Sequence, residues 1–171
     1  MTDPRTTQLA KNLVSHSCRV QPGEHVLLEI IDAPDEIAIE LIRAVREAGA
    51  HPHINLRHGR VTREMLAGAT DEQYETIARI ELAEMQGMDA YIAIRGGFNS
   101  FENSSVPAEK MALAQKHMRP VHNHRVCKTK WCVLRWPTPS MAQGAGMSTE
   151  AFEDFYFRCC LADYKQLRVA M

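Results

Sequence analysis

The stretch that decides the fold is His25-Val-Leu-Leu-Glu-Ile-Ile31, followed by the segment from Asp32-Ala-Pro-Asp35 to Gly49. Its first seven residues are apolar on both alternating faces except at Glu29. This pattern is typical of a central parallel strand that helices cover on each side. Asp32 suits a helix N-cap and Pro34 suits the first turn. An apolar stripe at helical spacing follows, and Gly49 is placed to end the helix, so the segment predicts a β–α unit.

The rest of the chain alternates between strand and helix patterns. Further strands are predicted at 51–57, 89–95 and 131–136, and further helices at about 7–17, 70–86, 107–118 and from 148. The strand at 51–57 has one polar face and a proline, which indicates an outer position, whereas 25–31 and 89–95 are expected at the centre. Strands that alternate with helices predict a parallel sheet with right-handed crossovers. We therefore expect a three-layer α/β fold: a small, doubly wound, Rossmann-like sheet of about four strands with helices on both faces.

Length and composition predict one domain. The 171 residues contain no repeat, low-complexity tract or break in composition, and a chain of this size buries roughly 70% of its unfolded surface. A formal net charge of −1 gives no overall attraction to nucleic acid or to an anionic membrane. The polar start lacks the apolar core of a signal peptide, and the apolar runs are too short to span a bilayer. We expect a cytoplasmic protein with neither a nucleic-acid nor a membrane partner.

A basic bias marks the region from Lys110 to Thr149, which contains no acidic residue. Such a bias can attract RNA or an acidic ligand. The region has no aromatic residues interleaved on a sheet face, and the acidic stretch at 71–89 balances its charge. A solvated or partner-facing surface is therefore the favoured interpretation.

Two groups of histidines invite a metal-site hypothesis. His122-Asn-His124-Arg-Val-Cys127, with Cys132, contains the donors of a tetrahedral zinc site, but the spacing matches no zinc finger and Cys132 falls within a predicted strand. A loop with surface histidines and buried cysteines is favoured instead. His51 and His53 share one strand face, but no carboxylate is evidently placed to complete a site. We expect no metal in this chain.

The ends of the predicted strands carry no catalytic motif. Ligands of open parallel sheets bind beyond the carboxyl ends of the strands, yet no G-x-G-x-x-G follows the first strand, and no Walker pattern or G-x-S-x-G elbow occurs. Gly96-Gly97, after the third strand, is interpreted as a turn that needs positive φ. Residue chemistry alone thus predicts an α/β domain without an identified active site.

Three longer stretches carry a family resemblance. They are Leu9-Ala-Lys-Asn-Leu-Val-Ser-His-Ser-Cys-Arg-Val-Gln-Pro-Gly-Glu-His-Val-Leu-Leu-Glu-Ile30, Glu40-Leu-Ile-Arg-Ala-Val-Arg-Glu-Ala-Gly-Ala-His-Pro52 and Lys130-Trp-Cys-Val-Leu-Arg-Trp-Pro-Thr-Pro-Ser-Met-Ala-Gln-Gly-Ala-Gly-Met-Ser-Thr-Glu-Ala-Phe-Glu-Asp-Phe155. Together they resemble the amino-terminal half of the aminopeptidase T / aminopeptidase S family of metallo-aminopeptidases. The resemblance covers essentially the whole chain, and the third stretch, with both tryptophans, is the most specific.

The resemblance implies a two-domain enzyme about twice this length that removes amino-terminal residues from peptides. Two divalent metal ions, zinc or cobalt, would activate a water there, and their ligands come from the carboxyl-terminal half of the family. No residue of this chain inherits a catalytic or metal-binding role. The chain is expected to be the amino-terminal domain, inactive alone, which helps to form a homodimer and one wall of the cleft over the metals. Arg95, Asn99, Trp136 and Thr138, at strand ends, are the residues expected to face that cleft or the missing domain.

Two alternatives stay open. Dihydroxypyridine dioxygenases resemble the same family but use one non-haem iron, and the ligand sets that distinguish them lie in the other half. The second alternative is a stand-alone, non-catalytic binding module that shares only the fold.

Overall fold

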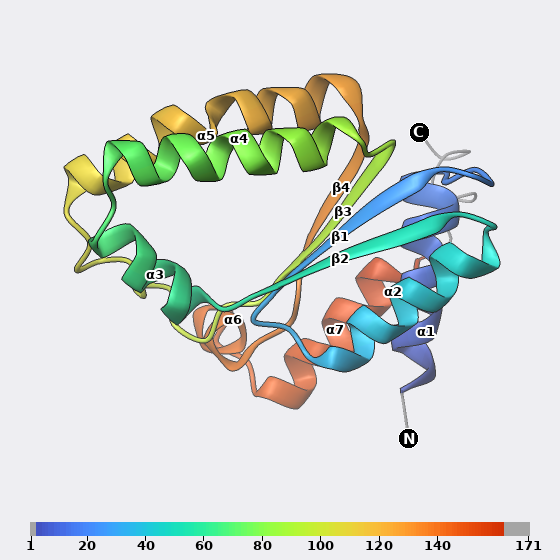
Figure 1. The fold of residues 1–171 in the computed structure, drawn as a ribbon. Helices are drawn as coiled ribbons and strands as arrows, with labels where there is room; N and C mark the ends of the chain where they lie inside the picture. Colours follow the sequence, from blue (N-terminus) through green and yellow to red (C-terminus); the bar gives the residue numbers. More distant parts are fainter. Residues whose placement is uncertain (1–2, 163–171) are drawn as a thin grey trace.

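A four-stranded parallel sheet organises the molecule, for which a computed structural model describes residues 3–162. The strand order is β2-β1-β3-β4. Strands β1 (His25–Ile31) and β3 (Ala90–Arg95) lie at the centre, and β2 (His51–Arg57) and β4 (Lys130–Arg135) lie at the edges (Figure 1). The predicted parallel α/β sheet and the predicted central and outer positions of the first three strands are confirmed.

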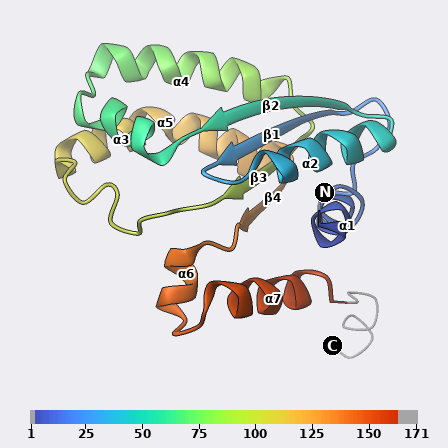
Figure 2. The same ribbon diagram turned by 90° about the horizontal axis from the view of Figure 1, so that it is seen from below.

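Helices cover both faces of the sheet and make three layers (Figures 1 and 2). The helices of one face are α1 (Pro4–Asn12), its π-helical continuation η1 (Leu13–Ser17), α2 (Asp35–Glu47) and α7 (Thr149–Cys160). Those of the other face are α4 (Asp71–Gln86) and α5 (Ala108–Lys128). Two short helices, α3 (Gly59–Ala67) and α6 (Pro139–Gly144), follow β2 and β4. Within residues 3–162, no helix is long and apolar enough to cross a membrane.

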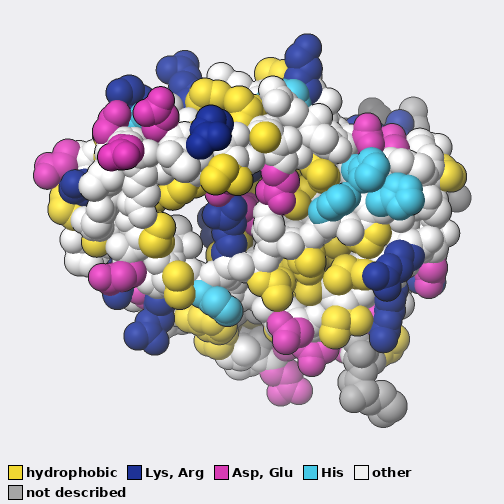
Figure 3. Space-filling view, viewed as in Figure 1, with side chains coloured by type: hydrophobic (Ala, Val, Ile, Leu, Met, Phe, Trp, Pro, Cys, Tyr) yellow, Lys and Arg dark blue, Asp and Glu magenta, His cyan; other side chains and the backbone are white. Residues whose placement is uncertain are grey.

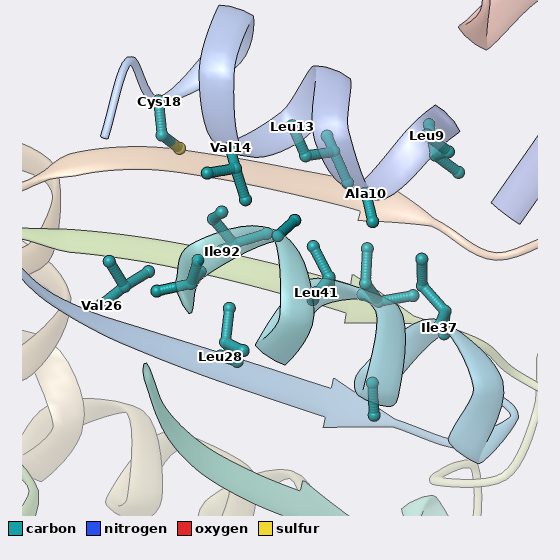
Figure 4. Packing of buried hydrophobic residues seen from close by; sticks show 14 of the residues in the cluster. Leu9, Ala10, Leu13, Val14, Cys18, Val26, Leu28, Ile37, Leu41 and Ile92 are labelled. Carbon is teal, nitrogen blue, oxygen red and sulfur yellow. The ribbon is translucent and has the colours of Figure 1, made fainter. Parts of the chain in front are cut away.

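The larger core lies between the sheet and the layer of α1, α2 and α7. Leu28 of β1 and Ile92 of β3 point into this layer and meet Leu41 of α2, and all three are fully buried (Figure 4). Replacing such a side chain by alanine typically costs 2–5 kcal/mol. The opposite face has a smaller core around Leu27 and Tyr91, so the two faces of the sheet are unequal. Most of the buried apolar side chains therefore lie between the sheet and the α1–α2–α7 layer. Fewer lie between the sheet and the α4–α5 layer, where polar groups are also found.

Local hydrogen bonds and one glycine define several helix ends. The Thr70 hydroxyl accepts the Gln73 N–H at the start of α4, and the Ser148 hydroxyl accepts the Ala151 N–H at the start of α7. Gly49 has φ +75° just after α2, as a helix-ending glycine requires. The prediction that Gly49 ends the helix is confirmed.

The predicted role of Asp32 as the N-cap of α2 is wrong. Asp32 has φ +47°, and Pro34 occupies the N-cap position. The Asp32 carboxylate instead accepts the backbone N–H of Gly59, 2.9 Å away, at the start of α3. A contact between the ends of two strands has replaced a local cap, and only the tertiary fold brings those two groups together.

The helix from Pro107 is longer than predicted. It continues through Pro120 to Lys128, whereas the sequence placed its end near Met118. The residues His122, His124 and Cys127 therefore lie on α5 and not in a loop. The prediction also missed α3 and α6: α3 has no buried residue, and α6 is only six residues long, so neither shows a sustained apolar stripe.

Candidate functional site

The carboxyl ends of the strands surround a cavity of about 940 Å³. Its walls come from α3, the loop between β3 and α5, and the start of α6. At its base the ends of β1 and β3 cross closely, and the Gly96 N–H donates to the carbonyl oxygen of Ile31 over 2.7 Å. We call this hollow the edge cavity. It occupies the place where open parallel sheets usually bind ligands.

Gly96 is required by this crossing and not by positive φ. Among the described residues only Gly23, Gly49 and Gly146 are glycines with positive φ, so the predicted reason for Gly96-Gly97 is wrong. A Cβ on Gly96 would lie 2.0 Å from the backbone oxygen of Asp32, whereas a Cβ on Gly97 would meet nothing within 4 Å. Close backbone approach is therefore the physical role of the first glycine alone.

Two of the residues expected from the sequence, Arg95 and Asn99, line the edge cavity. The Arg95 Nε is buried and has no hydrogen-bond partner within residues 3–162. The Asn99 side chain accepts the backbone N–H of Phe101 at 3.0 Å and shapes the loop. Arg95 thus brings a half-buried guanidinium to the lining of the edge cavity.

The other two expected residues, Trp136 and Thr138, lie in packed surroundings behind the cavity. The Trp136 ring meets the Tyr156 and Phe157 rings edge-on, with centroids 6.4 and 6.1 Å away. Thr138 is only 3% exposed and caps α6 by accepting the Met141 N–H. Both residues fix the path from β4 to α6, which forms part of the cavity wall.

The loop between β3 and α5 presents two exposed aromatic rings beside the edge cavity. Phe98 is 72% exposed and Phe101 is 76% exposed. Strand and helix periods in the sequence did not indicate them, because such periods carry no information about the direction of loop side chains. Solvent-facing phenylalanines next to a cavity are typical of a surface that another protein segment covers.

A second cavity, of about 1030 Å³, lies between the sheet and the α4–α5 pair. Ile31, Gly59 and Asn103 border both cavities. Figure 3 shows the molecule hollowed below α4, with basic side chains inside. We call this space the inner cavity. It exists because polar residues of β1 and β2 face α4 and α5, where a close-packed apolar layer is otherwise usual.

A polar network forms the sheet side of the inner cavity. The Arg57 guanidinium pairs with the Glu29 carboxylate at 3.1 Å and with the Glu81 carboxylate at 2.8 Å, and the Tyr91 hydroxyl donates to Glu29. Burial raises the pKa of Tyr91 to about 12, so the phenol remains a neutral donor. Burial lowers the pKa of Arg57, but the hydrogen bond to Glu81 and the nearby charges of Glu81 and Glu29 together outweigh this effect, so the net shift is upward. The network holds two carboxylates and one guanidinium, so it keeps one formal negative charge.

No metal centre forms from the predicted donors. Within residues 3–162, no group of three or more His, Cys, Asp or Glu side chains is placed to hold a metal ion. His122 and Cys127 are exposed on α5, and Cys132 lies on β4, where it packs against the larger core. The described residues therefore do not provide the donor set of a two-metal centre, and no catalytic step is derived through one.

The histidines of β2 gain a neighbour that the sequence analysis missed. His25 of β1 pairs in register with His51, and its Nδ1 lies 2.9 Å from Nε2 of His53. Histidine side chains gather over the beginning of these strands (Figure 3). The two strands are adjacent only in the folded sheet, so no local pattern indicated this cluster.

The comparisons with known proteins agree with this geometry. Residues 2–167 match the profile of the Peptidase M29 family, the thermophilic metalloproteases. The chain belongs to this family. The M29 assignment supports the peptidase over the dioxygenase alternative, and it makes metal-dependent hydrolysis a property of the family to which the chain belongs. No curated protein matches the sequence.

One solved structure shows the same fold as this chain. AmpT from Thermus thermophilus matches 92% of this M29 chain at a TM-score of 0.70 and 16% identity, and the chain spans 43% of the AmpT chain. A LacI-family repressor from Corynebacterium glutamicum (TM-score 0.33, 12% identity, 77% of this chain and 60% of that one) is more distant. The CurK enoyl reductase is also more distant (TM-score 0.38, 13% identity, 92% of this chain and 49% of that one). The last two likenesses are too weak to support an argument.

Proposed function

We propose that this chain is the amino-terminal, non-catalytic domain of a two-domain, metal-dependent aminopeptidase. The observation that carries the proposal is the M29 match over residues 2–167 in a chain that spans 43% of AmpT. One α/β domain then corresponds to part of a longer enzyme. The second domain supplies the ligands of two divalent metal ions, zinc or cobalt, which activate the water that attacks the peptide.

The edge cavity is the proposed wall of the substrate cleft. Arg95 and Asn99 line it, and Phe98 and Phe101 stand beside it with their rings in solvent. A peptide substrate offers backbone carbonyls to the guanidinium and side chains to the rings. Trp136 and Thr138 are proposed as positioning residues, which hold the start of α6 against the same cavity.

The exposed rings also support a contact with the catalytic domain. Burying two phenylalanine rings contributes roughly 1.5–3 kcal/mol each. A homodimer of the complete enzyme is part of the same proposal. Light scattering tests this part of the proposal, because a homodimer has twice the molar mass of the single enzyme chain.

The first experiment measures hydrolysis of leucyl-p-nitroanilide by the 171-residue chain and by the complete enzyme, each with added zinc or cobalt. Turnover by the complete enzyme alone is expected. Turnover by the isolated chain that is lost on chelation, in a preparation free of other proteases, would show that this domain is itself catalytic.

The second experiment tests the cleft wall in the complete enzyme. The double substitution Phe98→Ser with Phe101→Ser is expected to raise KM or weaken domain association, because it removes the apolar rim. The matched control is Phe155→Ser, which changes a ring that is 47% exposed on α7, away from the edge cavity. Equal effects of the two variants would argue against the assignment of the cleft to this edge.

A further inference from the structure

We propose that the inner cavity binds a small organic carboxylate with an apolar body, such as an acylated amino acid or a short peptide with a free carboxyl end. The inner cavity adjoins the edge cavity at Ile31, Gly59 and Asn103, but its charged lining comes from β1, β2, α4 and α5. The proposal does not rest on the proposed function, because it uses only the residues that line the inner cavity.

The wall formed by α5 supplies the cations. Arg119 and Arg125 line the inner cavity, and within residues 3–162 neither forms an ion pair with a carboxylate. The absence of acidic residues from 110 to 149 is the sequence feature behind this. A guanidinium with free N–H groups in a partly enclosed space favours a planar, two-oxygen anion.

Arg125 is oriented for this task. Its guanidinium lies over the Tyr91 ring, 4.6 Å from the centroid, and it contacts Nδ1 of His122 at 2.7 Å. Stacking uses the face of the guanidinium, whereas its five N–H groups point outward in the plane. The contact with His122 occupies one edge position, so the others remain for a ligand. The Tyr91 ring thus holds the cation in place without neutralising it.

The charged groups in the lining of the inner cavity are three carboxylates and four cations: Glu29, Glu81, Glu84, Arg57, Lys116, Arg119 and Arg125. Glu29 and Glu81 share Arg57, and Glu84 accepts a hydrogen bond from Asn55 at 2.9 Å. Each carboxylate therefore already has a donor partner on the sheet. On α5, Lys116 lies 3.8 Å from the Asp71 carboxylate, whereas Arg119 and Arg125 pair with no carboxylate within residues 3–162. These two guanidiniums, and the one excess positive charge of the lining, favour an anionic ligand over an amine.

The remaining lining sets the body of the ligand. Leu27, Met85, Met118 and Val121 contribute apolar surface between the two helices and the sheet. A volume of about 1030 Å³ lies at the upper end of the roughly 300–1,000 Å³ of small-molecule sites, so it admits more than a single ion. A carboxylate carried by a branched aliphatic group fits both the guanidiniums of α5 and the apolar lining. Inorganic phosphate fits only the guanidiniums.

The test is calorimetric titration of the 171-residue chain with N-acetyl-leucine and with N-acetyl-leucinamide. These probes share the apolar body and differ in the carboxylate. The acid is expected to bind at least about tenfold more tightly than the amide. Equal affinities, or no binding of the acid tighter than about 1 mM, would overturn the proposal. Phosphate that binds as tightly as N-acetyl-leucine would reduce the site to a simple anion site and would also overturn it.

Two variants and a control locate the binding. Arg125→Gln is expected to weaken N-acetyl-leucine binding at least about tenfold and to leave the amide unaffected. Arg119→Gln, which changes an exposed residue, is also expected to weaken N-acetyl-leucine binding. It replaces Arg125→Gln in the test if circular dichroism shows that Arg125→Gln does not fold. The control is Lys128→Gln, the same loss of charge on the same helix outside the inner cavity. A control that weakens binding as much as the variants would refute the placement.

Discussion

Replacing Gly96 by alanine tests whether the crossing of β1 and β3 fixes the carboxyl edge of the sheet. The added methyl carbon would lie 2.0 Å from the Asp32 oxygen, 2.7 Å from the Asp32 carbonyl carbon and 3.3 Å from the Ile31 oxygen. All three atoms belong to the backbone and cannot rotate away. The strand ends must therefore separate by more than an ångström.

The cost follows from two terms. Forcing a methyl group into a packed site typically costs 1–3 kcal/mol. Separation also stretches the 2.7 Å hydrogen bond from the Gly96 N–H to the Ile31 oxygen, which adds about 1 kcal/mol. We expect a loss of about 3 kcal/mol, a large share of the 5–15 kcal/mol of a typical domain.

Urea unfolding of Gly96→Ala and Gly97→Ala provides the assay. With an m-value of about 2 kcal/mol/M, the midpoint of Gly96→Ala should fall by about 1.5 M at unchanged m. Gly97→Ala is the matched control, since its methyl would meet nothing within 4 Å, and its midpoint should stay the same or rise slightly. Wild-type stability of Gly96→Ala, or equal losses in the two variants, would refute the close approach.

Three further predictions concern capping, pH and metal content. Ser148→Ala removes the acceptor for the Ala151 N–H and should lower stability by about 1 kcal/mol, or Tm by about 3 °C in calorimetry. Burial raises the pKa of the Cys18 thiol to about 12 from its ordinary 9.0, so above pH 9 the unfolded chain releases a proton that the folded chain keeps. The free energy of unfolding should then fall with rising pH by at most about 1.4 kcal/mol per pH unit. Cys18→Ala should flatten the pH dependence of Tm, whereas a substitution of the exposed Cys127 should leave it unchanged. Elemental analysis should find less than one zinc per chain; one tightly bound zinc, lost in Cys127→Ala, would contradict the arrangement of donors along α5.

Periodicity was sufficient for the strands. The unbroken apolar pattern of β1 reflects burial on both faces, and the half-polar pattern of β2 predicted its edge position, although no residue of β2 is fully buried. The apolar face of β2 is less protected than its pattern indicates, with Ile54 39% exposed and Leu56 58% exposed. An outer strand has only one neighbour to cover it.

Helix limits depended on whether a local signal existed. Helices were predicted to start near 70 and 148, and there the Thr70 and Ser148 hydroxyls accept the N–H groups of Gln73 and Ala151. Pro120 does not end α5, although a proline inside a helix removes a hydrogen bond, and tertiary packing of α5 on α4 overrides this local cost.

The amino-acid sequence by itself determined the parallel α/β fold, the family and the absence of a recognisable catalytic motif, because these depend on patterns within single segments. The tertiary structure decided how the strand ends meet. Three contacts join residues that are far apart in the chain. They are the approach of Gly96 to Asp32, the ion pairs of Arg57 with Glu29 and Glu81, and the stacking of Arg125 on Tyr91. Sequence distance carries no information about such contacts, and both cavities are built from them.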